Sequence, residues 1–230
     1  MDRCKDFIQV SSHAFKNTLT KLGKSYLVFA FIFLRLLVES TNIAGMARLG
    51  GLTSFVSYLI DVFLLSFIAQ ALKSLVVYGN VGKKSIGNSI NIFFQPLLST
   101  MFYLYLVNLF VDMLVMGADP RGQFIVKFIV RLLTSATLEE IYIGNKHGIH
   151  ALTSSVKFVV DNLLTYGLYA GIFLGLESLL TVRFHARLGA NDIILTLIVA
   201  LIHSFFCIFR GHLYKYTDDH PYRQRKFMRG

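Results

Sequence analysis

Long apolar runs are the feature that most constrains how this 230-residue chain folds. A helix that crosses a bilayer needs about 20 predominantly apolar residues, and the sequence contains about six runs of that kind. Hydrophobic residues make up 54% of the chain and charged residues only 16%, whereas a soluble domain carries about 25% charged residues. Too few polar side chains remain to cover a soluble surface. The sequence therefore predicts an all-α, polytopic membrane bundle of about six transmembrane helices.

The predicted spans are separated by short polar segments. They cover residues 22–44, 52–72, 90–116, 122–143, 156–180 and 192–209. The third span contains Pro96, which lacks a backbone N–H donor and is expected to tilt or kink the helix. The fourth contains four charged side chains, so its assignment as a span depends on the distribution of charge along the whole chain.

The basic residues indicate the orientation of the bundle, because lysine and arginine concentrate in cytoplasmic loops. With six crossings and the N-terminus inside, 16 of the 23 basic residues lie on the inner side. Four lie outside, at Arg48, Arg121, Arg183 and Arg187. Omitting the fourth span would weaken this bias. We therefore expect a protein of the cell membrane with both ends in the cytoplasm. We attribute the net charge of +10 to basic residues that orient the chain in the membrane, and not to nucleic-acid binding.

Residues 1–21 are predicted to form a separate amphipathic segment. Ile8, Phe15, Leu19 and Leu22 recur at helical spacing among lysines, a pattern typical of a helix that lies in the membrane interface. Its lysines would contact anionic lipid headgroups of the inner leaflet. A cytoplasmic extension of the first span is the alternative. Residues 22–210 are then the membrane domain, and residues 211–230 are a basic cytoplasmic tail.

An internal repeat subdivides the membrane domain. Residues 85–98 (SIGNSINIFFQPLL) align without gaps with residues 151–164 (ALTSSVKFVVDNLL), and each segment follows a Gly-Asn pair. The repeat predicts three hairpins, each with an amphipathic segment on the cytoplasmic side, a span out and a span back. Chance similarity between apolar segments is the alternative.

Ionisable side chains inside the spans define two candidate clusters, since each costs about 2.5–3.5 kcal/mol on insertion scales and needs a partner or a function. Residues at one depth form an intramembrane polar cluster of Arg35, Glu39, Asp61 and Arg131. Residues nearer the cytoplasm form an inner-face polar cluster of Glu139, Glu140, Asp161 and Arg210. We favour interhelical ion pairs that fix the bundle. A polar pathway or substrate pocket is the alternative.

Two further patterns concern packing and metals. Gly167, Gly171 and Gly175 recur every four residues in the fifth span and predict a smooth stripe where another helix, by default from the same chain, approaches closely. His147 and His150 lack the glutamate of the helical metalloprotease motif and are interpreted as loop residues. We predict no metal, no cofactor and no catalytic residues.

A resemblance to a known group rests on three segments that are distributed along nearly the whole length of the chain. They are DFIQVSSHAFKNTLTKLGKSYL near the start, LEEIYIGNKHGIHALTSSVKFVVDN at the end of the fourth span, and FFCIFRGHLYKYTDD before the tail. The order of these features resembles a diffuse group of small bacterial membrane proteins related to the membrane domain of some glycerophosphoryl diester phosphodiesterases. The resemblance implies a six-helix membrane module without catalytic residues, and it does not extend to the phosphodiesterase domain.

Three function classes follow from these features. A non-enzymatic scaffold or accessory subunit with a membrane protein partner is favoured, because no catalytic constellation is visible. A transport protein or permease component is the alternative, on the basis of the intramembrane charges. A lipid-modifying membrane enzyme is the third class. It would require Glu139, Glu140, His147 and His150 to converge on one cleft.

Overall fold

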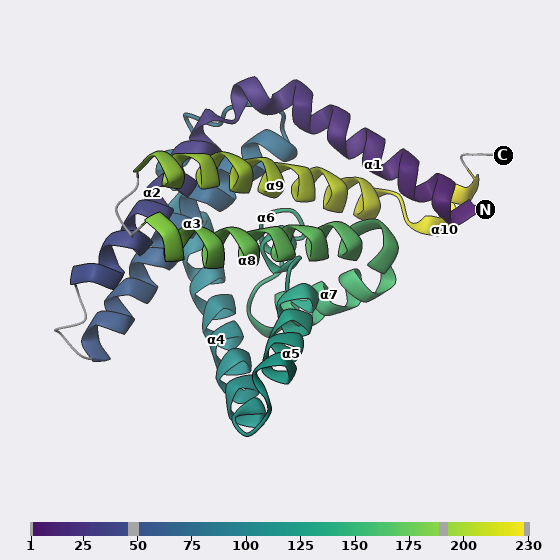
Figure 1. The fold of residues 1–230 in the computed structure, drawn as a ribbon. Helices are drawn as coiled ribbons and strands as arrows, with labels where there is room; N and C mark the ends of the chain where they lie inside the picture. Colours follow the sequence, from purple (N-terminus) through teal and green to yellow (C-terminus); the bar gives the residue numbers. More distant parts are fainter. Residues whose placement is uncertain (1, 46–50, 189–192, 228–230) are drawn as a thin grey trace.

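The structure is a computed structural model that describes residues 2–45, 51–188 and 193–227. Every regular element in these ranges is helical (Figure 1). The main helices are α1 (Asp2–Lys21), α2 (Tyr26–Gly45), α3 (Gly51–Val76), α4 (Gln95–Val115), α5 (Pro120–Leu133), α6 (Thr137–Tyr142), α7 (Gly148–Asp161), α8 (Leu168–Leu188), α9 (Ile193–Asp219) and α10 (Tyr222–Phe227). The all-α prediction is confirmed for the described part of the chain.

Three helical segments are long and apolar enough to cross a membrane. They are Phe55–Val76, Ile86–Val115 and Ile193–Asp219. A fourth candidate is a bent pair, Gly148–Asp161 with Leu163–Leu179. Three or four candidate spans within the described ranges support membrane association, but length and hydropathy alone do not establish six crossings. Residues 40–44 of the first predicted span, together with Arg48, Arg183 and Arg187, have side chains outside the described part.

The predicted fifth span is not one straight helix, because its two halves meet at an angle of 94°. The break lies at Asn162, whose side-chain amide donates a 3.0 Å hydrogen bond to the carbonyl of Phe158. Such local side-chain bonds compete with the helical ladder. A π turn, Leu163–Gly167, then leads into α8.

The predicted fourth span, at residues 122–143, is divided into α5 and α6 by residues 134–136. At this break the Thr134 hydroxyl donates to the carbonyl of Val130 at 2.9 Å. The third predicted span also differs from expectation. Pro96 lies in the first turn of α4, directly after a π turn at Ile90–Phe94. A proline is tolerated there, because the first turn of a helix needs no backbone donor at that position.

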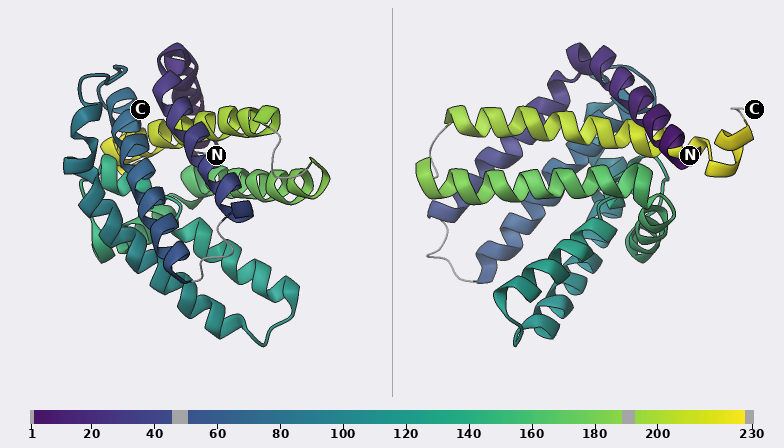
Figure 2. Two further views of the ribbon diagram at one scale, coloured as in Figure 1. Left: turned by 90° about the vertical axis from the view of Figure 1, so that its left-hand side faces the viewer. Right: turned by 45° about the vertical axis from the view of Figure 1, so that its right-hand side comes forward.

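The longest helices form three pairs of antiparallel neighbours, α2 with α3, α4 with α5 and α8 with α9. The pairs splay apart from a common region that contains α6 and α7, as the views in Figures 1 and 2 show together. Helix α1 lies along α9, and the first residues of α1 lie beside α10. This common region is called the hub below.

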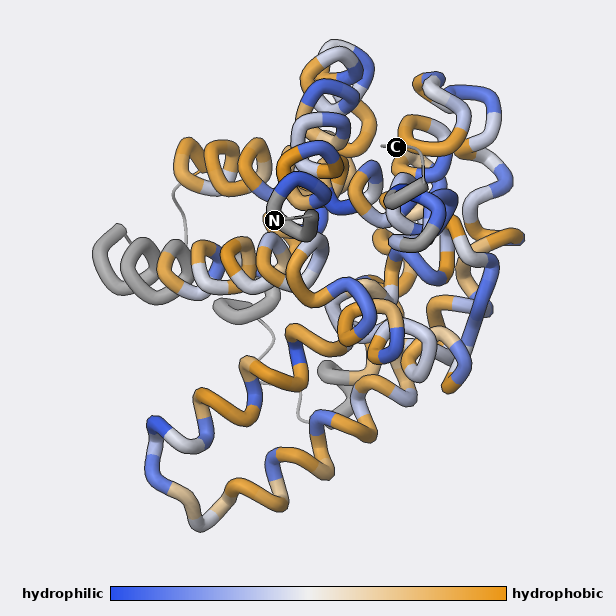
Figure 3. Tube along the Cα trace, turned by 90° about the vertical axis from the view of Figure 1, so that its right-hand side faces the viewer, coloured by the Kyte–Doolittle hydropathy of each residue, from blue (hydrophilic) through white to orange (hydrophobic). Residues whose placement is uncertain are grey.

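Burial differs strongly between the pairs. Half of an 18-residue apolar window within Phe55–Val76 is buried, whereas only 11% of a window of the same length within Ile86–Val115 is buried. Figure 3 shows the α4–α5 pair as a mostly apolar hairpin that projects away from the hub. The large buried side chains gather in the hub, where the ends of α3 and α6 meet the second half of α9. Helices α3, α7 and α8 contact parts of the α4–α5 hairpin, but many of its large apolar side chains are exposed within the described part of the chain.

The loops after α3 and α6 share an unusual backbone, which supports the internal repeat. Gly79 and Asn145 correspond at an offset of 66 residues, and both have a positive φ, of 70° and 53°. Gly82 and Gly148 correspond at the same offset, with φ of 74° and 60°. Positive φ is uncommon for residues other than glycine, and asparagine is one of those that tolerate it best. The aligned segments therefore follow equivalent turns.

The same offset relates the hydrogen bonds of these loops. The Asn80 amide donates to the Ser74 carbonyl, and the Lys146 amide donates to the Glu140 carbonyl, each at 3.0 Å. The two copies diverge further on, where the second copy breaks at Asn162 and the first continues as α4. The two segments thus have similar backbone conformations at the turns and different ones from the helix break at Asn162 onward.

Candidate functional site

The centre of the hub is the short helix α6, which carries two buried carboxylates. Glu139 and Glu140 lie in its first turn, and each is only 1% exposed. A helix N-terminus favours negative charge, but the dipole of a six-residue helix is too small to offset the free-energy cost of burying two carboxylates. Each carboxylate must therefore have a cationic partner.

Glu139 pairs with Arg210 of α9. One carboxylate oxygen, Oε1, accepts hydrogen bonds from Arg210 Nη2 at 2.9 Å and from Arg210 Nε at 3.1 Å. The Arg210 side chain is 17% exposed, so water has little access to the pair. The other oxygen of Glu139, Oε2, has no hydrogen-bond partner in the described part of the chain. The sequence-predicted contact between these two members of the inner-face cluster is present.

Glu140 pairs with Lys146, whose Nζ lies 2.8 Å from Oε2 of the carboxylate. Lys146 belongs to the loop after α6 and is itself exposed. Adjacent positions on a helix point about 100° apart, and accordingly the two glutamates bind different cations. Asp161, the fourth member of the inner-face cluster, lies exposed at the end of α7 and takes part in none of the ion pairs found between described residues. The structure does not bring it to the other three.

A close approach of helices completes the hub at Gly211. A side-chain carbon at this position would overlap the hydroxyl of the buried Tyr142 and would lie 3.0 Å from Cγ2 of Val76. The ends of α3 and α6 therefore press against the backbone of α9 one residue after Arg210. Sequence reasoning missed this glycine because it is isolated and forms no periodic pattern.

The predicted glycine stripe behaves differently. A carbon added at Gly171 would lie 3.8 Å from Leu132 of α5, which is ordinary contact, and one added at Gly175 would meet nothing within 4 Å. Gly167 is buried against its own neighbouring turn, with Leu163 nearest. No described helix of the same chain approaches closely at Gly171 or Gly175, so the packing stripe stays a prediction, with a second protein as the other partner considered.

The intramembrane polar cluster reduces to one bidentate pair between α2 and α3. Arg35 Nε lies 2.6 Å from Asp61 Oδ1, and Arg35 Nη2 lies 3.3 Å from Asp61 Oδ2. Both side chains are partly exposed. Glu39 and Arg131 are exposed and do not join the pair. Of the two arginines in the predicted cluster, Arg35 and Arg131, Arg35 is the one that pairs with Asp61.

Sequence reasoning missed two further ion pairs. Lys127 of α5 lies 2.7 Å from Asp112 of α4 on an exposed surface. Arg225 of α10 holds Asp6 of α1 through two hydrogen bonds of 3.0 and 3.1 Å, and both side chains are buried. Asp6 and Arg225 lie at opposite ends of the chain, and no spacing pattern connects them. Their bond joins the two terminal helices.

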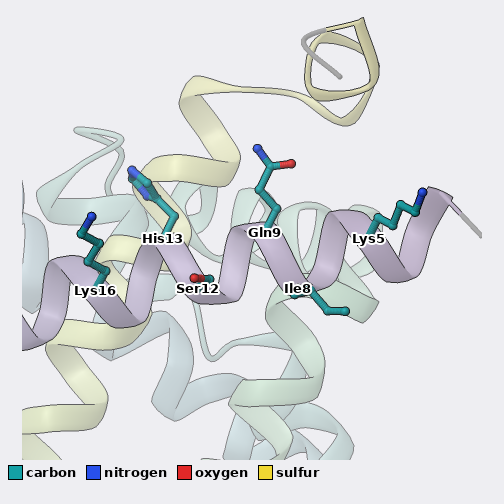
Figure 4. A pocket seen from close by; sticks show the side chains of 6 residues that line it. All are labelled: Lys5, Ile8, Gln9, Ser12, His13 and Lys16. Atoms are coloured by element: carbon teal, nitrogen blue, oxygen red, sulfur yellow. The ribbon is translucent and has the colours of Figure 1, made fainter. Parts of the chain in front are cut away.

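Helix α1 presents three different faces. Its inner face, which includes Val10, Ala14 and Thr18, is buried and packs on α9. The four apolar residues that predicted the amphipathic segment, Ile8, Phe15, Leu19 and Leu22, are exposed. A shallow pocket follows the polar side of the helix (Figure 4). It is lined by Lys5, Ile8, Gln9, Ser12, His13 and Lys16. The exposed surface of α1 is thus amphipathic, as the sequence predicts.

The histidine residues considered for a metal site lie away from the buried carboxylates. His147 and His150 are exposed, whereas Glu139 and Glu140 lie inside the hub. No group of three or more metal-ligating side chains occurs in the described ranges. The four residues that a lipid-modifying site would require do not converge on one cleft.

Comparison of the chain with protein-family models, with curated proteins and with solved structures finds no match. The resemblance to the membrane domain of glycerophosphoryl diester phosphodiesterases therefore stays a prediction.

Proposed function

We propose that this chain is a non-catalytic, multi-pass protein of the cell membrane that serves as a scaffold or accessory subunit of a membrane complex. The observation that carries the proposal is the apolar α4–α5 hairpin, because only 11% of an 18-residue apolar window within Ile86–Val115 is buried. Monomeric soluble proteins rarely expose apolar surface on this scale. Lipid and a partner helix are the environments that would cover it.

Six crossings in three hairpins are part of this proposal. The pairs α2–α3, α4–α5 and α8–α9 each supply two antiparallel helices. Exposed apolar residues continue along α5 at Phe124, Ile125 and Ile129, which supports α5 with α6 as a broken fourth crossing. A broken helix is tolerated at membrane depth where the break is buried in protein. The charge distribution then places both chain ends in the cytoplasm.

Helix α1 supplies the proposed contact with the membrane surface. Its exposed apolar residues would enter the interface, while Lys5 and Lys16 would face anionic headgroups of the inner leaflet. Each such lysine contributes about 1 kcal/mol near an anionic surface. The Asp6–Arg225 bond fixes α1 to the end of the chain, so both termini would lie at one surface.

Paired charges favour a scaffold over a transporter. Arg35 is paired with Asp61, and Arg210 is paired with Glu139. Paired residues of this kind fix helix positions, whereas a transport route needs polar groups that face water. Transport stays the second candidate because Glu139 Oε2 is buried without a hydrogen-bond partner in the described ranges, and such an atom can take part in a proton relay.

Photocrosslinking in native membranes tests the accessory role. A photoreactive amino acid replaces Met113 on α4, which is 67% exposed, and Leu72 of the hub, which is buried, serves as the matched control. We expect one protein adduct of defined mass from position 113 and none from position 72. Lipid adducts alone from position 113 would contradict the accessory role. Proton flux in vesicles that is abolished by Glu139→Gln would support transport instead.

A further inference from the structure

Three lysines from separate elements gather at the loop that follows α3. Lys21 ends α1, Lys24 lies in the turn Leu22–Lys24, and Lys215 belongs to α9. Their bonds run from Lys21 Nζ to the Leu75 carbonyl at 3.3 Å, from Lys215 Nζ to the Val77 carbonyl at 3.2 Å and from Lys24 Nζ to the Gly79 carbonyl at 3.4 Å. An ammonium group has three donors, so each lysine retains donors for another ligand.

The positive charge at this site has no carboxylate partner. None of the three lysines belongs to an ion pair between described residues. Burial, together with the Lys215 and Lys24 ammonium groups, lowers the pKa of Lys21. Helix C-termini favour cations, which explains one lysine at the end of α3. A single helix end does not account for three mutually repelling ammonium groups.

A buried histidine provides an independent indication of a ligand. His212 is only 5% exposed, and its Nε2 has no hydrogen-bond partner in the described part of the chain. His212 lies three residues before Lys215 in α9, so the two side chains share one face of the helix. Leaving a buried donor or acceptor unsatisfied costs about 1–3 kcal/mol. A ligand that accepts hydrogen bonds at the lysine site would offset this cost.

We propose that Lys21, Lys24, Lys215 and His212 bind a phosphate group. A phosphate offers several strong acceptor oxygens and a negative charge, which match separate ammonium donors and a ring N–H. An anionic lipid headgroup and a soluble phosphate compound both present these oxygens, and the test below distinguishes the two sources. The exposed side chains of Leu22, Tyr26 and Tyr78 flank the site and would accommodate the apolar part of a lipid. The site does not depend on the accessory role proposed above.

Binding to the full chain, purified in a neutral detergent, tests this site. One arm measures radiolabelled inorganic phosphate by equilibrium dialysis, and the other measures short-chain phosphatidylglycerol by native mass spectrometry. The variants are Lys24→Gln and Lys215→Gln. The matched control is Lys157→Gln, which removes the same charge from the exposed side of α7. Thermal unfolding of every variant checks that the fold is retained. If Lys215→Gln fails to fold, the exposed Lys24 still supplies a test.

We expect one 1:1 complex whose dissociation constant rises about tenfold in Lys24→Gln and Lys215→Gln and less than twofold in Lys157→Gln. Phosphatidylglycerol binding that inorganic phosphate does not displace assigns the site to a lipid headgroup. Binding of inorganic phosphate, or displacement by it, assigns the site to a soluble phosphate compound. The proposal is overturned if neither compound binds, or if Lys157→Gln weakens binding as much as the other two variants do.

Discussion

Removing either partner of the Glu139–Arg210 pair is expected to destabilise the hub. Glu139→Leu leaves the Arg210 guanidinium without its carboxylate, and Arg210→Met leaves a carboxylate that is 1% exposed without its cation. The double variant replaces both charges with apolar side chains. A structural pair predicts that the double variant is more stable than at least one of the single variants.

The magnitude follows from the burial of each partner. Breaking a buried ion pair by removing one side costs about 3–5 kcal/mol, whereas replacing both sides is often nearly neutral. Arg210 is 17% exposed and retains some contact with water, so we expect Glu139→Leu to cost about 3 kcal/mol. Glu139 is more deeply buried, and we expect Arg210→Met to cost about 5 kcal/mol. The two losses should not add in the double variant.

Reversible unfolding in mixed detergent, followed by far-ultraviolet circular dichroism, measures these free energies. Lys127→Met is the matched control, because the Lys127–Asp112 pair is exposed and its loss should cost about 0–1 kcal/mol. If Arg210→Met costs no more than Lys127→Met, the buried pair does not stabilise the hub. Additive losses in the double variant would equally refute the reasoning.

Three other substitutions test separate contacts, and a fourth, Gly175→Ala, is a control. Gly211→Ala should lower the free energy of unfolding by about 1–3 kcal/mol, because the added carbon overlaps the Tyr142 hydroxyl. Gly175→Ala, which faces open space, should change it by less than about 0.5 kcal/mol in the same assay. Asp61→Asn should reduce the yield of monodisperse protein in size-exclusion chromatography, and an unchanged yield would contradict a structural role for its pair with Arg35. Arg225→Met should speed hydrogen exchange in α1, because this helix loses its link to α10.

Several features could be predicted from the sequence because they depend on patterns along the chain. The apolar runs indicate the long helices, and helical spacing indicates the amphipathic surface of α1. Equal depth within the spans correctly suggested Arg35 as a partner for Asp61. The same reasoning placed Glu139 and Arg210 near each other, and the structure brings them to 2.9 Å. The depth of a residue in a membrane span and the helical spacing of residues can both be calculated from their positions in the sequence.

Other features depend on contacts that no periodic pattern encodes. Hydropathy changes little across Asn162 or residues 134–136, where local side-chain hydrogen bonds compete with the helix. The sequence suggested a continuous glycine stripe, but the closest helix approach occurs at the isolated Gly211. The Asp6–Arg225 pair connects opposite ends of the chain. Such long-range pairings arise only when the helices pack.

The most direct test of the six-crossing account is the location of the two ends of the α5–α6 segment. Single cysteines replace Arg121 and His147, both exposed, in a background in which Cys4 and Cys207 are changed to serine. A membrane-impermeant maleimide is then applied to intact and to permeabilised cells. The account predicts that position 121 is labelled in intact cells and that position 147 is labelled only after permeabilisation. Labelling of both positions from the same side would contradict it.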